Sequence, residues 1–269
     1  GDGAARLIGA GLALLCAVLV GLGLLGLAVW SVADVWRFPD ALPSRVSLGG
    51  WTDNWPATRA LLAVTVLVAL LATLIATAIT LACLENETRR ARAPGPRVLS
   101  LLYLPIVVPQ VSFLFGLQVL MLAAGFGPSL GAVVFAHLVF VLPYVLLSLG
   151  DAWRSLDPRF GAVAAALGAS DARIFLRIRL PLLLPAILTA AAVGFAVSVG
   201  LYLPTALIGA GRIATVTTES IALSAGGSRR LIGVASVLQM VLPLLAFSLA
   251  LAVPAVVFRN RRGLRNAQP

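Results

Sequence analysis

The stretch LGASDARIFLRIRLPLLLP, residues 167–185, sets four charged residues directly before a long apolar run that begins at Leu180. The charged residues are Asp171, Arg173, Arg177 and Arg179. A charged side chain is costly in the hydrocarbon of a bilayer, whereas an apolar run is favoured there. The stretch therefore predicts the point at which a membrane-spanning helix meets water, and its charged part is expected to serve a contact outside the bilayer.

The composition of the whole chain agrees with a membrane location. Of the 269 residues, 60% are hydrophobic and 11% are charged, against about 25% charged in an ordinary soluble domain, and the mean hydropathy is +1.03. The net charge is +10, but all 20 basic residues are Arg and they stand at the ends of apolar runs. Because they do not gather in one basic patch, they indicate membrane topology rather than binding to nucleic acid.

Six apolar segments reach the length of about 20 residues that a helix needs to cross a bilayer. They are 7–33, 60–84, 98–124, 129–149, 180–207 and 231–258. None alternates polar and apolar residues as a barrel strand does, so we expect an all-α integral membrane protein with six transmembrane helices. The first segment is too long for the core of a secretory signal and is expected to be a true span. Residues 1–269 are interpreted as a single transmembrane domain, with 151–179 as its longest loop.

The Arg residues predict an orientation, because loops on the cytoplasmic side of a membrane carry an excess of positive charge. If the N-terminus is cytoplasmic, 14 of the 20 Arg residues lie on the inner side. These are Arg6, Arg89, Arg90, Arg92, Arg97, Arg154, Arg159, Arg173, Arg177, Arg179, Arg259, Arg261, Arg262 and Arg265. The first outer loop then carries Trp30, Trp36, Trp51 and Trp55, as an interfacial belt would. Both termini are therefore expected in the cytoplasm.

Residue types that are absent or isolated in the chain restrict the chemical functions that it can have. The chain has no Lys, so it lacks a phosphate-loop Lys and any ATP has to be handled by a partner. GLGLLG at 21–26 lies inside the first span and is expected to permit helix packing rather than to bind a dinucleotide. Cys16 and Cys83 are expected to be small buried packing residues, and His137 a hydrogen-bonding residue within a helix. No catalytic residue and no metal ligand set is predicted.

The loop 151–179 is expected to form a compact helix–turn–helix. An Ala-rich helix follows Asp157 and Pro158, which suit a cap and a first helical turn. Gly168 permits a turn, and Ser170 or Asp171 caps a second short helix. A new helix then starts at Leu180, with Pro181 in its first turn. This unit, edged by Arg, is suited to docking into another protein.

At these residues the chain resembles a known family. The spacing of Gly168, nine residues, Ile178, one residue, Leu180 and Pro181, with GAS at 168–170 and Phe175, is similar to the cytoplasmic EAA loop of binding-protein-dependent ABC importer permeases. The resemblance implies the type I ABC importer permease fold, like that of methionine permeases, with one extra first helix. The family has an acidic residue and an Ala where this chain has Ala162 and Val163.

This resemblance implies a coupling role for the loop. The implied ATPase-coupling residues are Gly168, Ala169, Ser170, Arg173, Phe175, Arg177, Ile178, Leu180 and Pro181. Gly168 would set the turn, Ala169 and Ser170 would let the loop fit closely, and the Arg residues, with Arg179, would pair with acidic groups on the ATPase. The alternative for the Arg residues is that they only anchor the topology.

The resemblance also implies partners and a location. A cytoplasmic ABC ATPase dimer would hold ATP and Mg, so this chain would bind no cofactor itself. A second permease subunit, identical or related, would complete the pathway, and a periplasmic or lipid-anchored protein would deliver the substrate. The location implied is the bacterial inner (plasma) membrane. The stretches 194–220 and 226–233 resemble a branch labelled thiamine transport permeases, which suggests a small, polar, thiamine-like substrate.

Polar residues near Pro are candidates for a substrate pathway, because polar groups in spans are costly unless they face water or the bundle interior. They are Gln110, Ser112, Tyr144, Ser198, Tyr202 and Thr205. Glu219 is a further candidate, because it is the sole acidic residue between the apolar cores of the last two spans and could meet a cationic substrate or shape an outer gate. The alternative is that they only join helices through hydrogen bonds, and for Glu219 that it is solvated or paired with Arg212. A secondary transporter or channel without an ATPase is the competing function, but the spans carry no clear acidic group for ion coupling and no selectivity filter.

Overall fold

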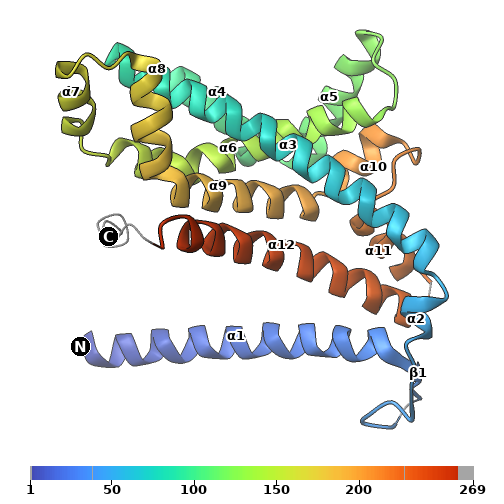
Figure 1. Cartoon of the computed structure of the whole chain (residues 1–269). Coiled ribbons are helices and arrows are strands. Elements are labelled where there is room, and N and C mark those ends of the chain that lie inside the picture. The colour runs from blue at the N-terminus through green and yellow to red at the C-terminus, as the bar shows by residue number, and fades with distance from the viewer. Residues whose placement is uncertain (1, 38, 227, 260–269) are drawn as a thin grey trace. The chain divides into compact units, whose positions relative to one another are not determined.

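The computed structural model describes residues 2–37, 39–226 and 228–259, and their regular structure is almost entirely helical (Figure 1). One small antiparallel sheet pairs β1 (Ala33–Val35) with β2 (Arg45–Val46). The helices are α1 (Asp2–Val32), α2 (Gly49–Thr52), α3 (Trp55–Arg90), α4 (Pro96–Val107), α5 (Gln110–Ala123), α6 (Leu130–Arg154), α7 (Arg159–Ala166), α8 (Asp171–Ile174), the π-helical turn η1 (Phe175–Arg179), α9 (Leu180–Gly200), α10 (Leu203–Gly209), α11 (Val216–Ser224) and α12 (Arg229–Val257). The all-α class is thereby confirmed. Arg261, Arg262 and Arg265 lie outside the described residues.

Five of the described helical segments are long and apolar enough to cross a membrane. They are Ile8–Val32, Trp55–Arg90, Leu130–Arg154, Asp171–Gly200 and Arg229–Val257. The pair α4 and α5 gives a sixth if it is counted as one span, although the two helices are bent by 108°. If α4 and α5 are counted as one span, the described helices include the six spans that the sequence predicts.

The segment 98–124 is not the continuous helix that its hydropathy predicts. The helix stops at Val107 and restarts at Gln110, with Val108 in an extended conformation (φ −78°, ψ 141°). Pro109 explains the break, because it has no N–H to continue the ladder and disfavours a helical conformation in the residue before it. The predicted segment 98–124 is therefore a pair of helices broken at Pro109.

The segment 180–207 is also divided. Helix α9 ends at Gly200, Leu201 is extended (ψ 105°), and α10 begins at Leu203 with Pro204 in its first turn. Pro204 cannot donate to the carbonyl of Gly200, so the ladder of α9 cannot run through it. The predicted span was therefore seven residues too long at its C-terminal end.

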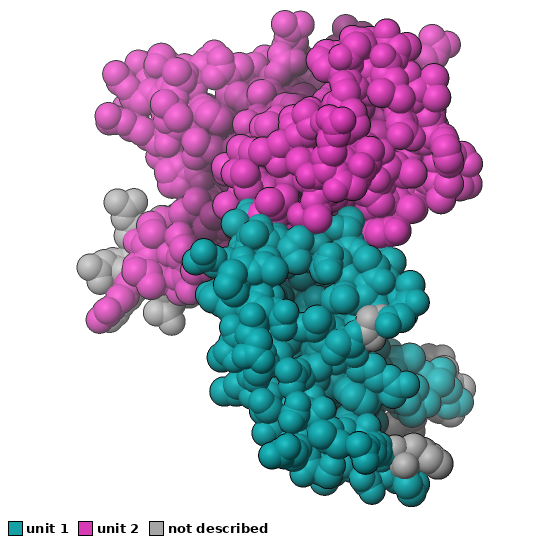
Figure 2. Space-filling model, turned by 90° about the vertical axis from the view of Figure 1, so that its right-hand side faces the viewer, with its two compact units in different colours: residues 1–63, 215–241 teal, residues 64–214, 242–269 magenta. Residues whose placement is uncertain are grey.

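The described chain forms two compact units, coloured separately in Figure 2. Unit 1 comprises residues 1–63 and 215–241, and unit 2 comprises 64–214 and 242–269. Two of the three boundaries between the units fall inside α3 and α12, and the third lies between α10 and α11. The interpretation of 1–269 as one transmembrane domain stays a prediction.

In unit 1 the end of α1 is fixed to the start of α12. A Cβ atom at Gly233 would lie 2.5 Å from the backbone nitrogen of Ser31, so only a glycine fits this approach. Arg230 pairs with Asp34 at 2.7 Å. The ring of Trp30 stacks on Trp36 at 4.5 Å, and the guanidinium of Arg229 lies 5.2 Å from the same Trp30 ring. These contacts hold the β1–β2 hairpin close to the first span.

The GLGLLG stretch of α1 makes no close helix contact within the described residues. Nothing lies within 4 Å of where a Cβ atom would stand at Gly21, Gly23 or Gly26. The expected close packing therefore has no partner among the described helices.

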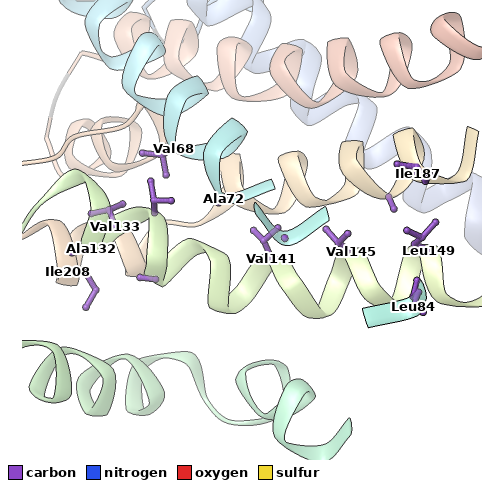
Figure 3. Packing of buried hydrophobic residues seen from close by; sticks show 14 of the residues in the cluster. Val68, Ala72, Leu84, Ala132, Val133, Val141, Val145, Leu149, Ile187 and Ile208 are labelled. Carbon is purple, nitrogen blue, oxygen red and sulfur yellow. The ribbon is translucent and has the colours of Figure 1, made fainter. Parts of the chain in front are cut away.

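The core of unit 2 forms where α6 runs along α9, with α3 beside them (Figure 3). Val141 and Val145 of α6 are completely buried. Gly194 of α9 faces them, and a Cβ atom there would stand 2.7 Å from Cγ2 of Val145. The missing side chain at Gly194 therefore sets how closely α6 and α9 approach.

The two cysteines lie on exposed helix faces, contrary to the expected burial. Cys16 belongs to α1 and Cys83 to α3. Both helices are apolar over most of their circumference, so hydropathy shows that a residue lies in a span but not which face is covered. The prediction that they are buried packing residues was wrong.

Candidate functional site: a projecting helical segment

Residues 155–179 of unit 2 form a segment that leaves α6 and returns into α9 (Figure 1). Its first helix, α7, starts one residue later than expected, with Pro158 rather than Asp157 at the N-cap position. A carboxylate oxygen of Asp157 still accepts the backbone N–H of Arg159 at 2.8 Å. Such a bond satisfies one of the free N–H groups at a helix start. The run of Ala residues then favours the helix itself.

Gly168 ends this helix in a left-handed conformation, with φ of +80°. Its N–H donates to the carbonyl of Ala165 at 2.9 Å, and the N–H of Ala169 donates to the carbonyl of Ala164 at 3.0 Å. This pair of bonds is a Schellman motif, for which glycine is the preferred residue. The turn that the sequence predicts at Gly168 is confirmed.

The second half of the segment differs from the expectation. Instead of a separate short helix, α8, η1 and α9 form one continuous helix from Asp171 to Gly200. The N–H of Leu180 donates to the carbonyl of Phe175, five residues back, which is the π-helical pattern. Pro181 has no N–H for the carbonyl of Arg177, and the wider π turn accommodates this gap. The segment is therefore joined to the membrane helix α9 without a break in the helix.

Helix α7 has two different faces. Gly161 faces inward, where a Cβ atom would stand 3.5 Å from the Arg179 guanidinium and 3.8 Å from Ile174. On the other face, Phe160, Val163 and Leu167 are 52%, 61% and 83% exposed. These three residues are spaced three and four apart, so they lie on one side of the helix. We call them the docking face, because an exposed apolar surface on a projecting element is typical of a contact with another protein.

A buried ion pair fixes the base of the segment to α3. Glu85, which is 7% exposed, accepts from Nη1 of Arg179 at 2.6 Å and from Nε of Arg89 at 2.7 Å. Arg89 also lies 4.0 Å from Asp171 of α8. We call Glu85, Arg89, Asp171 and Arg179 the anchor cluster. The expected pairing of Arg179 with a partner protein is thus replaced by a bond within the chain.

A second set of contacts ties α3 to the end of α6. Arg154 donates from two nitrogens to the carboxylate of Glu87, at 2.9 and 3.2 Å. The indole N–H of Trp153 donates to the hydroxyl of Thr88 at 2.9 Å, and the Trp153 ring lies 6.3 Å from that of Phe175. Bidentate bonds fix geometry as well as charge. The projecting segment is therefore held from both of its ends.

The structure brings the proposed coupling residues together in this segment. Gly168, Ser170, Arg173 and Arg177 are exposed. The half-buried members are Ala169, Phe175, Ile178, Leu180 and Pro181. Arg173 and Arg177 make no ion pair within the described part of the chain, so both remain open to a partner. Their coupling role stays a prediction.

Two of the expected pathway residues meet at His137. Its Nδ1 lies 2.8 Å from the hydroxyl of Ser198, and its Nε2 lies 2.8 Å from that of Thr205. Thr205 also donates to the carbonyl of Leu201 at 3.3 Å. The set is satisfied when Nε2 donates to Thr205 and Nδ1 accepts from Ser198. His137 is thereby confirmed as a hydrogen-bonding residue, and it joins α6, α9 and α10.

The other expected pathway residues are placed separately. Gln110 begins α5 and is half-buried, Ser112 and Tyr144 are exposed, and Tyr202 is the N-cap of α10. Glu219 belongs to unit 1, where it borders a cavity of about 90 Å³ with Asn54 and Thr58. The role of all seven residues in transport stays a prediction.

Several structural side chains were not predicted from the sequence. Glu85 and Arg89 stand four residues apart on α3, a spacing that indicates an ion pair within a helix. The bond from Glu85 to Arg179 joins residues 94 positions apart and has no local signal. The same holds for Gln118, whose amide donates to the carbonyl of Leu207 at 3.1 Å and links α5 to α10.

The fold and this segment define a multi-pass helical membrane protein with a projecting, partly apolar segment that is bonded to α3. Comparison with known proteins gives the family. The chain belongs to the binding-protein-dependent transport system inner membrane components, whose family pattern matches residues 79–262. The match covers α6 to α10 and the whole projecting segment, and the resemblance inferred from the sequence is confirmed.

Individual relatives of the chain are also named as permease proteins. The chain is similar to the inner membrane ABC transporter permease protein YnjC of Escherichia coli, with 42% identity over 164 residues, which are 61% of this chain and 32% of that protein. It is similar to the molybdenum transport system permease protein ModB of Mycobacterium tuberculosis, with 36% identity over 43% of this chain and 47% of that protein.

A further relative is the spermidine/putrescine transport system permease protein PotC of Haemophilus influenzae, which is 30% identical over 40% of this chain and 43% of its own length. Each match spans less than half of the relative's length. The chain is thus an inner membrane permease component of a binding-protein-dependent transport system, with the type I fold expected from the sequence.

Proposed function

We propose that the chain forms part of the pathway of an ATP-driven importer and receives its driving force through the docking face. The observation that carries the proposal is the exposed row of Phe160, Val163 and Leu167 on a segment that is bonded to α3 and continuous with α9. A cytoplasmic ABC ATPase dimer is the partner that fits this face. ATP and Mg would be held by that partner, since this chain has no Lys for a phosphate loop.

The mechanism proposed is a rigid-body movement. When ATP closes the ATPase pair, the docked segment moves with it. The anchor cluster and the continuous helix from Asp171 to Gly200 would transmit this movement to α3 and α9 together. Access to the pathway would then switch between the two sides of the membrane. Arg173 and Arg177 would add ion pairs with acidic groups on the ATPase.

The proposed assembly has two further partners. A second permease subunit, identical or related, would face this one across the pathway, and a periplasmic or lipid-anchored binding protein would deliver the substrate. The N- and C-termini would be cytoplasmic in the bacterial inner membrane, because that orientation places the docking face on the same side as the ATPase and agrees with the Arg distribution.

The substrate we propose is a small polar solute. The expected pathway groups are hydroxyls, an amide and one carboxylate, which can bind a polar molecule through hydrogen bonds. A thiamine-like molecule remains the hypothesis from the sequence, and the relatives are named for molybdenum and for spermidine and putrescine. Thermal unfolding of the companion binding protein with each of these would choose among them, because a bound ligand stabilises only the folded form.

One pair of variants tests the docking proposal. Val163→Asp places a carboxylate in the middle of the docking face, whereas Ala162→Glu places one at the neighbouring position, where the family carries an acidic residue. An unpaired charge in an interface costs several kcal/mol, so Val163→Asp should reduce recovery of the ATPase with the purified chain by more than about tenfold. Ala162→Glu should leave the recovery unchanged or raise it.

The competing functions, a secondary transporter or a channel without an ATPase, predict a different result in these experiments. If both variants recover the ATPase equally well, the docking face is wrongly assigned. If no ATPase is recovered with the unmodified chain and membrane vesicles take up substrate without ATP, the chain acts as a secondary transporter or channel.

A further inference from the structure

A cavity of about 230 Å³ lies between α3, α4 and α6 in unit 2, outside the projecting segment. Its wall is mainly apolar and consists of Ile79, Cys83, Leu84, Val98, Leu99, Leu102, Leu142 and Leu146. Its rim is polar and consists of Asn86, Glu87, Arg92 and Arg154. One side of the cavity is thus suited to hydrocarbon and the other to a charged group.

The rim carries surplus positive charge. Arg154 is paired with Glu87, but Arg92 is exposed and makes no ion pair within the described residues. The chain reverses direction at Ala91, which has φ of +48°, and the N–H of Arg92 donates to the carbonyl of Glu87 at 3.2 Å. This turn fixes the backbone of Arg92 beside the rim. The position therefore favours an anion.

We propose that this cavity binds an anionic phospholipid. The phosphate would lie against Arg92 and Arg154, and an acyl chain would cover the wall formed by Leu99, Leu102 and Leu142. Arginine pockets between membrane helices suit such headgroups. A small soluble anion would use the rim but leave the apolar wall open to water.

Another apolar cavity offers an internal comparison. It has a volume of about 600 Å³ and is bordered by Leu117, Met121, Phe126 and Phe135, with no charged side chain among its described lining residues. Hydrocarbon could enter there too, but without selection for the headgroup. Charge selectivity is therefore the property that identifies the cavity beside Arg92.

The test uses the full chain, freed of lipid in detergent and then incubated with phosphatidylglycerol or with phosphatidylcholine of the same acyl chains. Native mass spectrometry measures the fraction of protein that retains lipid. We expect preferential retention of phosphatidylglycerol and a loss of about fivefold in Arg92→Gln, since a basic residue near a lipid surface contributes about 1 kcal/mol. Arg97→Gln is the matched control, because Arg97 is exposed in the first turn of α4, five residues after Arg92, and does not border the cavity.

Equal retention of the two lipids by the unmodified chain, or equal loss in Arg92→Gln and Arg97→Gln, would overturn the proposal. So would inorganic phosphate that raises the unfolding temperature as much as phosphatidylglycerol does, since the site would then be one for a soluble anion.

Discussion

Gly168 and Gly194 are both required by the fold, but for different reasons. At Gly168 the backbone is left-handed, and an added Cβ atom would meet nothing within 4 Å. At Gly194 the backbone is helical, and a Cβ atom would meet two Val side chains of α6. The first residue is constrained by conformation and the second by space, so their substitutions should behave differently.

At Gly168 we expect backbone strain. Gly168→Val should lower the stability of the segment by about 1–2 kcal/mol, because a β-branched residue is disfavoured at positive φ. Gly168→Asn should cost clearly less, since Asn adopts the left-handed region more readily. Hydrogen exchange of the amides in α7 and α8 measures the difference. If Gly168→Asn and Gly168→Val raise the exchange rates equally, the presence of a side chain, rather than the left-handed backbone conformation, limits which residues fit at position 168.

At Gly194 we expect a loss of packing. The Cβ of Gly194→Ala would stand 2.7 Å from Cγ2 of Val145 and 3.1 Å from Cγ1 of Val141, and a β-branched residue cannot easily turn away. Overpacking of this kind costs about 1–3 kcal/mol. Gly200→Ala in the same helix is the control, because nothing lies within 4 Å of its Cβ position. Thermal unfolding in detergent should separate the two, and equal values would contradict the close approach of α6 and α9.

At the scale of elements, hydropathy identifies the helices but not their breaks. The helix α7, its start near Asp157 and its end at Gly168 could be predicted because each signal is local. The breaks at Pro109 and before Pro204 fall inside apolar runs, where hydropathy stays high through the bend. The π turn before Leu180 was missed for a related reason, since Pro181 suits a helix start as well as a π turn.

The link between α3 and α9 depends on Glu85 and Arg179. Removing Glu85 leaves Arg179 without a partner, which costs about 3–5 kcal/mol for a buried charge, whereas removing Arg179 leaves Glu85 paired with Arg89 and should cost less. Glu85→Gln and Arg179→Gln should each lower the unfolding temperature, and the double variant should lose less than the sum of the two. The interaction energy in this cycle should be about 1–3 kcal/mol.

Arg173→Gln is the matched control for this cycle. Arg173 is exposed and makes no ion pair among the described residues, so its replacement should change stability by less than about 0.5 kcal/mol. Additive losses in the Glu85 and Arg179 cycle would show that the two side chains do not act as a pair.

At the scale of the whole molecule, the sequence predicted the membrane class and the family but not which helix faces are covered. Cys16 and Cys83 show this, since both lie in apolar spans and both are exposed. The anchor cluster could not be predicted either, because Glu85 and Arg179 are 94 positions apart and only folding brings them together. The distribution of Arg residues, by contrast, predicts a property of the whole chain, namely its orientation in the membrane.

The orientation can be tested with single cysteines after Cys16→Ser and Cys83→Ser. Ser155→Cys follows α6 at the start of the projecting segment, and Ser228→Cys precedes α12, and both positions are exposed. With 14 of 20 Arg residues on the inner side, a membrane-impermeant maleimide should label Ser228→Cys in intact cells and Ser155→Cys only after permeabilisation. The reverse pattern would put Phe160, Val163 and Leu167 outside the cell, where no cytoplasmic ATPase could reach them, and the coupling proposal would fail with it.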